Sequence, residues 1–128
     1  MRKGYLAHYC CCGNELHKRS IIYTSDNLLC GIEQFSCETP HTTFYDGLLI
    51  VVAPSFEPHC NTFIEQLQQL LDDNTQLPIT EAILQCNIYK SHHATHNEPC
   101  LIYSITPIDW TQLRPAKRQG MKIELIER

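Results

Sequence analysis

The longest apolar run of the chain, Leu48–Ala53 (LLIVVA), has the length of one β-strand. It ends at Pro54, which has no backbone N–H to donate to a neighbouring strand. The segments before it are rich in β-branched and aromatic residues and are separated by turn residues; they are 4–9, 20–24, 28–32 and 42–45. The first part of the chain is therefore predicted to form short strands, with Leu48–Ala53 as a buried one.

After Pro54 the apolar residues recur at helical spacing, at Phe63, Leu67, Leu70 and Leu71. Thr62 and Glu65 form a capping box in front of this predicted helix, and Asp72–Asn74 end it. Pro78 suits the first turn of a second helix. The apolar face of that helix would consist of Ile79, Ile83, Cys86 and Tyr89.

Strand patterns return near the end of the sequence. The polar stretch 90–99 (KSHHATHNEP) predicts a loop, and 100–105 and 121–127 predict strands. We predict a single domain of 128 residues, α+β and mainly β, made of a β segment (1–58), two helices (59–90), a loop (91–99) and a second β segment (100–128).

The charge of the chain argues against nucleic acid as a partner. The net charge is −4 at pH 7, and no nucleic-acid-binding motif is present. Arg114, Lys117 and Arg118 form a short basic patch, but Glu124 and Glu127 follow it closely. We therefore expect no nucleic-acid binding.

A membrane partner is not expected either. No run approaches the roughly 20 apolar residues of a transmembrane helix. Residues 1–12 lack the sustained hydrophobic core and the cleavage site of a signal peptide. These features predict a cytoplasmic protein.

The chain contains eight cysteines, Cys10, Cys11, Cys12, Cys30, Cys37, Cys60, Cys86 and Cys100. In a reducing cytosol they are expected to be thiols. The three adjacent cysteines would alternate between the two faces of a strand, so they cannot all bind one metal. Because no Cys-x-x-Cys pair or zinc-module spacing occurs, we interpret the cysteines as small buried hydrophobic residues.

Three segments carry a recognisable pattern: 1–9 (MRKGYLAHY), Ile32-Glu33 and 42–60 (TTFYDGLLIVVAPSFEPHC). They resemble the start of amidohydrolase-superfamily enzymes of the aminohydrolase (deaminase) type. In that family an N-terminal β segment continues into Phe/Tyr-x-Gly, an apolar strand, Pro-Gly-Phe and His-x-His. The matching positions here are Tyr45, Gly47, Leu48–Val52, Pro54, Phe56 and His59.

The later segments 77–84 and 107–125 resemble the late helix and the closing β segment of the same enzymes. The resemblance implies a small composite β-sandwich built from N- and C-terminal strands. The family's metal-bearing barrel typically needs about 250 residues. Only two helices and a loop separate Pro54 from Cys100, so the barrel is missing from this chain.

The resemblance places His59 at the first metal-binding histidine of the family. Asn61 stands in place of the second histidine, and Ser55 in place of the glycine. A catalytic zinc needs several converging ligands and an open position for water. We therefore predict no metal at His59.

The remaining metal candidates are His92, His93 and His96 in the polar stretch, to which Cys100 could add a thiolate. On a helix, His92 and His96 would share one side. However, Asn97 and Pro99 favour a loop, and no glutamate completes a His-Glu-x-x-His motif. An exposed histidine-rich loop needs no ligand.

Cys60 is the best candidate for a reactive thiol, because a helix N-terminus would lower its pKa. Against this, adjacent side chains such as those of His59 and Cys60 seldom face each other, and a partly buried, inert thiol is the simpler interpretation.

The sequence as a whole predicts a non-catalytic binding or assembly module. Its partner would be another protein or a second copy of the chain, and no catalytic residue or cofactor is predicted. The alternative is a small zinc-dependent hydrolase of C–N bonds that uses the histidine-rich loop together with His59. A thiol enzyme that uses Cys60 is a third hypothesis.

Overall fold

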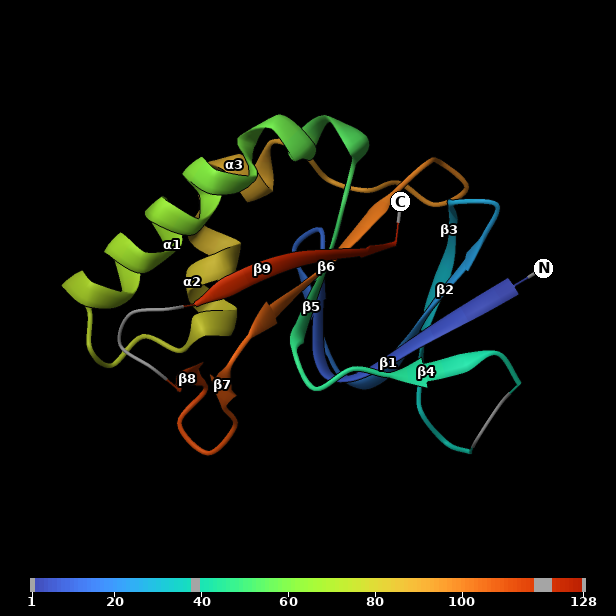
Figure 1. Ribbon diagram of the computed structural model, residues 1–128, viewed down its shortest axis with the longest axis horizontal. Coiled ribbons are helices and arrows are strands. Elements are labelled where there is room, and N and C mark those ends of the chain that lie inside the picture. Colours follow the sequence, from blue (N-terminus) through green and yellow to red (C-terminus); the bar gives the residue numbers. More distant parts are fainter. Residues whose placement is uncertain (1, 38–39, 117–120, 128) are drawn as a thin grey trace.

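The computed structural model describes residues 2–37, 40–116 and 121–127. Within them, strands from both ends of the chain join one mixed sheet in the order β3-β2-β1-β5-β6-β9, with β4 beside the first part of β1 (Figure 1). These strands are β1 (Arg2–Cys12), β2 (Glu15–Ser25), β3 (Leu28–Gln34), β4 (Thr42–Phe44), β5 (Leu48–Val52), β6 (Leu101–Thr106) and β9 (Lys122–Glu127). The predicted α+β, mainly β class is confirmed.

β1 lies inside this sheet and pairs with three other strands. β2 runs antiparallel along one edge. On the other edge, β4 pairs in parallel with Gly4–Leu6, and β5 pairs in parallel with Cys10–Cys12. The antiparallel strands β6 and β9 extend the sheet beyond β5.

The close approach of β5 and β6 explains the glycine that precedes β5. A Cβ atom at Gly47 would overlap the side chain of Ser104 on β6. Position 47 is therefore one where only glycine fits.

The side chains of β1 and β2 change faces midway along the two strands. Ala7 belongs to one apolar cluster, whereas Tyr9, two residues on, packs against the other. The change falls at His8 and Arg19, which the regular pairing register skips. Arg19 has a φ of +45°, a left-handed backbone that is uncommon for a residue with a Cβ atom.

Apolar clusters lie on both faces of the sheet, so the fold is sandwich-like. The larger cluster packs the helices against the sheet, and the helices lie together on the side away from β4 (Figure 1). Every residue of β5 is buried: Leu48, Ile50 and Val52 belong to the helix-side cluster, and Leu49 and Val51 to the other. This alternation is the two-residue period of a strand.

The second cluster is enclosed because the sheet curls until the segment before β6 meets the start of β3. The N–H of Leu29 donates to the carbonyl of Glu98 at 3.0 Å. The N–H of Cys100 donates to the carbonyl of Asn27 at 2.9 Å. The predicted loop 91–99 thus closes one end of the sheet.

The helical segment begins earlier than the capping box predicted, so that prediction was wrong. The 3-10 helix η1 (Pro54–His59) runs directly into α1 (Cys60–Asp73), and Thr62 lies inside α1 instead of capping it. The physical reason is Pro54, which occupies the first turn of η1, a position that proline favours.

The second predicted helix is divided into α2 (Ile79–Gln85) and α3 (Asn87–Lys90). Cys86 between them has an extended backbone, with φ −70° and ψ 123°. The predicted apolar face is nevertheless kept across the break, because Ile79, Ile83, Cys86 and Tyr89 are all buried.

A small hairpin of β7 (Ile108–Asp109) and β8 (Arg114–Pro115) precedes β9. Its turn begins at Asp109, whose carboxylate accepts a hydrogen bond from the Thr111 N–H at 3.0 Å. None of the described helices has the length and apolar character needed to cross a membrane.

Candidate functional site

The end of β5 brings together two of the predicted histidines. The N–H of Ala53 donates to the carbonyl of His92 at 2.9 Å, which draws the segment after α3 against η1. The Ser55 hydroxyl shares a hydrogen bond of 2.7 Å with Nδ1 of His92. The rings of His59 and His92 stack, with centroids 4.9 Å apart and planes 26° apart. Burial, and then the nearby His59, lowers the pKa of His92, so its ring is neutral at pH 7.

These stacked rings do not form a metal site in the observed arrangement. An imidazole binds zinc through a lone pair in the plane of its ring, at about 2.0–2.1 Å. The His59 and His92 rings stack with their planes 26° apart, so their in-plane lone pairs lie in nearly parallel planes and do not converge on one ion. Within residues 2–37, 40–116 and 121–127, no group of three or more His, Cys, Asp and Glu residues could hold a metal ion.

The other two candidate histidines lie elsewhere. The ring of His93 is 6.0 Å from the ring of Tyr89, centroid to centroid. His96 lines a separate hollow of 450 Å³ together with His17. The four candidates are therefore divided among three places.

The structure does not support two ideas about the polar stretch, the first because of the backbone and the second because of burial. His92 and His96 share no helical face, because the segment between them contains no helix. Cys100 is 1% exposed and points into the cluster on the sheet's second face, so its thiol is enclosed by apolar side chains.

The expectation that a helix end lowers the pKa of Cys60 was wrong, because burial raises the pKa of this thiol. A thiol is nucleophilic only as the thiolate, so Cys60 is poorly suited to attack a substrate.

The interpretation of the cysteines as buried hydrophobic residues is confirmed for Cys10, Cys11, Cys86 and Cys100. Burial raises the pKa of Cys10 to about 12 and that of Cys86 to about 11. Cys37 is exposed, the remaining three cysteines are partly buried, and all eight thiols are free of disulfides.

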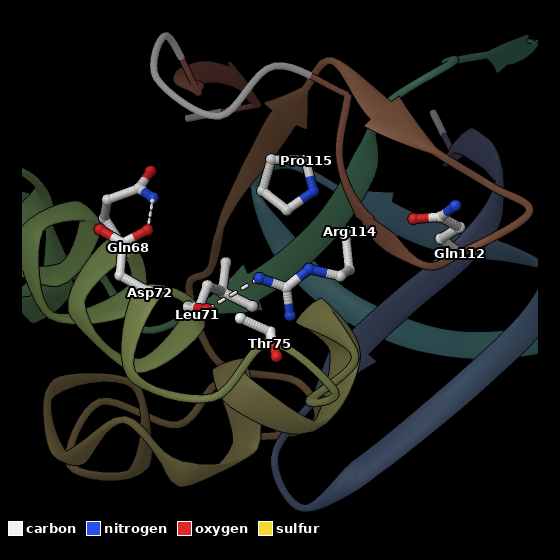
Figure 2. Close-up of a pocket in the computed structure, with 7 residues that line it drawn as sticks. All are labelled: Gln68, Leu71, Asp72, Thr75, Gln112, Arg114 and Pro115. Atoms are coloured by element: carbon white, nitrogen blue, oxygen red, sulfur yellow. Dashed lines mark hydrogen bonds between the residues drawn. The ribbon is translucent and has the colours of Figure 1, made fainter.

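Arg114 has a structural role at the end of α1. Figure 2 shows its guanidinium directed at Leu71, near the end of α1, within a hollow of 390 Å³. It donates to the carbonyls of Leu71 at 2.7 Å, Leu77 at 2.8 Å and Asn74 at 3.1 Å. A cation is favourable at the C-terminus of a helix, where carbonyls lack partners. Of the predicted basic patch, Lys117 and Arg118 lie outside the described residues.

An exposed group of side chains, most of them aromatic, was not predicted from the sequence. We call it the aromatic surface; it consists of His8, Arg19, Phe35, Phe44 and Trp110. Phe44 on β4 is 51% exposed. The His8 ring meets Phe44 edge-on at 5.3 Å and Trp110 at 4.9 Å, centroid to centroid. His8, Arg19, Phe35 and Phe44 also surround a hollow of 180 Å³.

Asp46 holds part of the aromatic surface in place. Its carboxylate accepts a hydrogen bond from the Trp110 Nε1–H at 3.3 Å and lies 3.9 Å from Nε2 of His8. The other side of Trp110 stacks on Tyr9, with centroids 5.8 Å apart. The Trp110 ring is thus fixed on two sides.

Comparisons with models of protein families, with curated proteins and with solved structures found no match. The resemblance to amidohydrolases therefore stays a prediction.

Proposed function

We propose that this chain is a non-catalytic binding module that docks another protein through the aromatic surface. The observation that carries the proposal is the half-exposed ring of Phe44, which stands beside His8 and a fixed Trp110. Leaving a large apolar side chain in water forgoes about 1.5–3 kcal/mol of burial free energy. Aromatic and arginine side chains arranged in this way are typical of the central residues of protein interfaces.

The end of β5 supports the non-catalytic part of the proposal. A serine nucleophile needs a histidine base that a third group orients through a hydrogen bond. Here His59 stacks on His92 and makes no hydrogen bond to it among the described contacts. Ser55 and His92 therefore form a local contact that ties η1 to the segment after α3.

A phage-displayed library of random peptides tests the proposal. We expect selection on the immobilised protein to enrich peptides that lose binding to the Phe44→Ala variant. Leu28→Ala is the matched control, because Leu28 is 37% exposed and does not line the hollow beside Phe44. Enriched peptides that bind the Phe44→Ala variant as well as the wild type would refute the proposed function.

A further inference from the structure

We propose that the segment docked by the aromatic surface is an acidic one, in which a single large apolar side chain is flanked by aspartate or glutamate. This inference rests on the proposed function and adds the chemical class of the partner. It is carried by the hollow beside Phe44, by the charges around it and by the backbone of Arg19.

The hollow has the size and lining for one apolar side chain. Its volume of 180 Å³ is about that of six water molecules in the liquid, enough for one aliphatic or aromatic group. Leu6 and Ala7 of β1 and the rings of Phe35 and Phe44 supply most of its wall. Water in such a hollow has few polar partners, so an apolar group would displace it favourably.

The charges at the rim of the hollow favour an anionic partner. Arg19 lines the hollow and is exposed. The nearby carboxylate, Asp46, is already directed at His8 and Trp110. Among the described residues that line the hollow, Arg19 alone carries a formal charge, and this cation favours an anionic group at the hollow although the whole chain carries a net charge of −4.

The backbone of Arg19 points to the same surface. Its φ of +45° is sparsely populated for residues other than glycine and asparagine, and such strain is found most often at binding and catalytic sites. The carbonyl of Arg19 accepts a hydrogen bond from the N–H of Phe35 at 2.8 Å, which holds this conformation. The same residue thus contributes the strained backbone and the cation at the hollow.

The single tryptophan of the chain, Trp110, gives a local signal for the test, because it belongs to the aromatic surface. The probe is the short peptide Glu-Asp-Glu-Phe-Glu-Asp-Glu, which contains no tryptophan. The comparison peptides replace Phe by Ala, or all acidic residues by Lys. We expect a saturable change of Trp110 fluorescence with the acidic Phe peptide and binding at least about tenfold weaker with either comparison peptide.

Two substitutions at Arg19 distinguish an effect of its charge on peptide binding from an effect on folding. Asparagine tolerates a positive φ, so Arg19→Asn should fold normally and bind the acidic peptide about tenfold more weakly. Arg19→Lys keeps the charge and should bind like the wild type, as should the Leu28→Ala control. Raising the salt concentration should weaken binding to the wild type more than it weakens the residual binding of Arg19→Asn.

The peptide experiments can show separately whether the partner class is wrong and whether the proposed function is wrong. If Phe44-dependent peptides from the library are neutral or basic and the acidic peptide does not bind, the partner class is wrong and the proposed function stands. If no peptide depends on Phe44, both are wrong. Self-association of the chain that Phe44→Ala abolishes would identify a second copy as the occupant and overturn the acidic-segment proposal.

Discussion

The lowered pKa of His92 should make the stability of the protein depend on pH. Its folded-state pKa is lowered from 6.5 by burial and then by His59. The unfolded chain therefore binds more protons near pH 6 than the folded chain does. We expect stability to be constant above the ordinary pKa and to fall as the pH drops below it, until the folded-state pKa is passed. Thermal melts between neutral and mildly acidic pH measure this loss.

A His92→Gln variant is the control for that pH dependence. It should show a flatter decline of the melting temperature over the same pH range, because the group with the lowered pKa is absent. An unchanged decline in His92→Gln would show that other residues cause the acid sensitivity.

The hydroxyl of Tyr89 is a side-chain group whose removal should not lower the stability of the folded protein. It is buried without a hydrogen-bond partner among the described residues, and burial raises its pKa. An unpaired buried hydroxyl costs about 1–3 kcal/mol, so Tyr89→Phe should match the wild type or exceed its unfolding free energy by about 1 kcal/mol. Urea unfolding measures the difference.

The comparison variant is Tyr89→Ala, which also removes the ring and should cost about 3–5 kcal/mol. A clear loss of stability in Tyr89→Phe would mean that the hydroxyl has a favourable partner in solution, contrary to the structure.

At the scale of elements, Arg114 joins the β7–β8 hairpin to the end of α1. Its three hydrogen bonds go to carbonyls that no helical N–H can reach. Arg114→Ala should lower the unfolding free energy by about 2 kcal/mol, as measured by urea unfolding. Gln112→Ala, an exposed neighbour that lines the same hollow, should change it by less than about 0.5 kcal/mol. Equal effects of the two substitutions would contradict the assigned role of Arg114.

The elements themselves could be predicted largely from local patterns. The strand at Leu48–Ala53 and the buried face of Ile79, Ile83, Cys86 and Tyr89 follow from apolar spacing, which reports burial directly. The break at Cys86 does not follow, because the apolar face continues through it. The start of α1 was misplaced because the capping box at Thr62 competed with the prolines of η1.

The candidate site was the harder part to predict. His8, Arg19, Phe35, Phe44 and Trp110 come from five separate segments that only the sheet and the hairpin bring together. The left-handed backbone at Arg19 has no signal in the sequence, since neither glycine nor asparagine occupies the position. The exposed Phe44 on a strand of three residues was the one local hint.

At the scale of the whole molecule, the fold separates the histidines that a hydrolase would need to gather. We expect tag-free protein to carry no stoichiometric zinc in elemental analysis, because the His59 and His92 rings stack and His96 lies in another hollow. Asn61→His should not change this result. Stoichiometric zinc that is lost in His92→Ala would favour the hydrolase alternative.

We propose that the molecule binds its partner through the aromatic surface and not through the end of β5. Amide hydrogen exchange with and without the most enriched library peptide tests this most directly. We predict slower exchange on peptide binding in Thr42–Phe44 and at Arg19, with no change in 54–60 and 91–93. Slower exchange confined to 54–60 and 91–93, around His59 and His92, would contradict it.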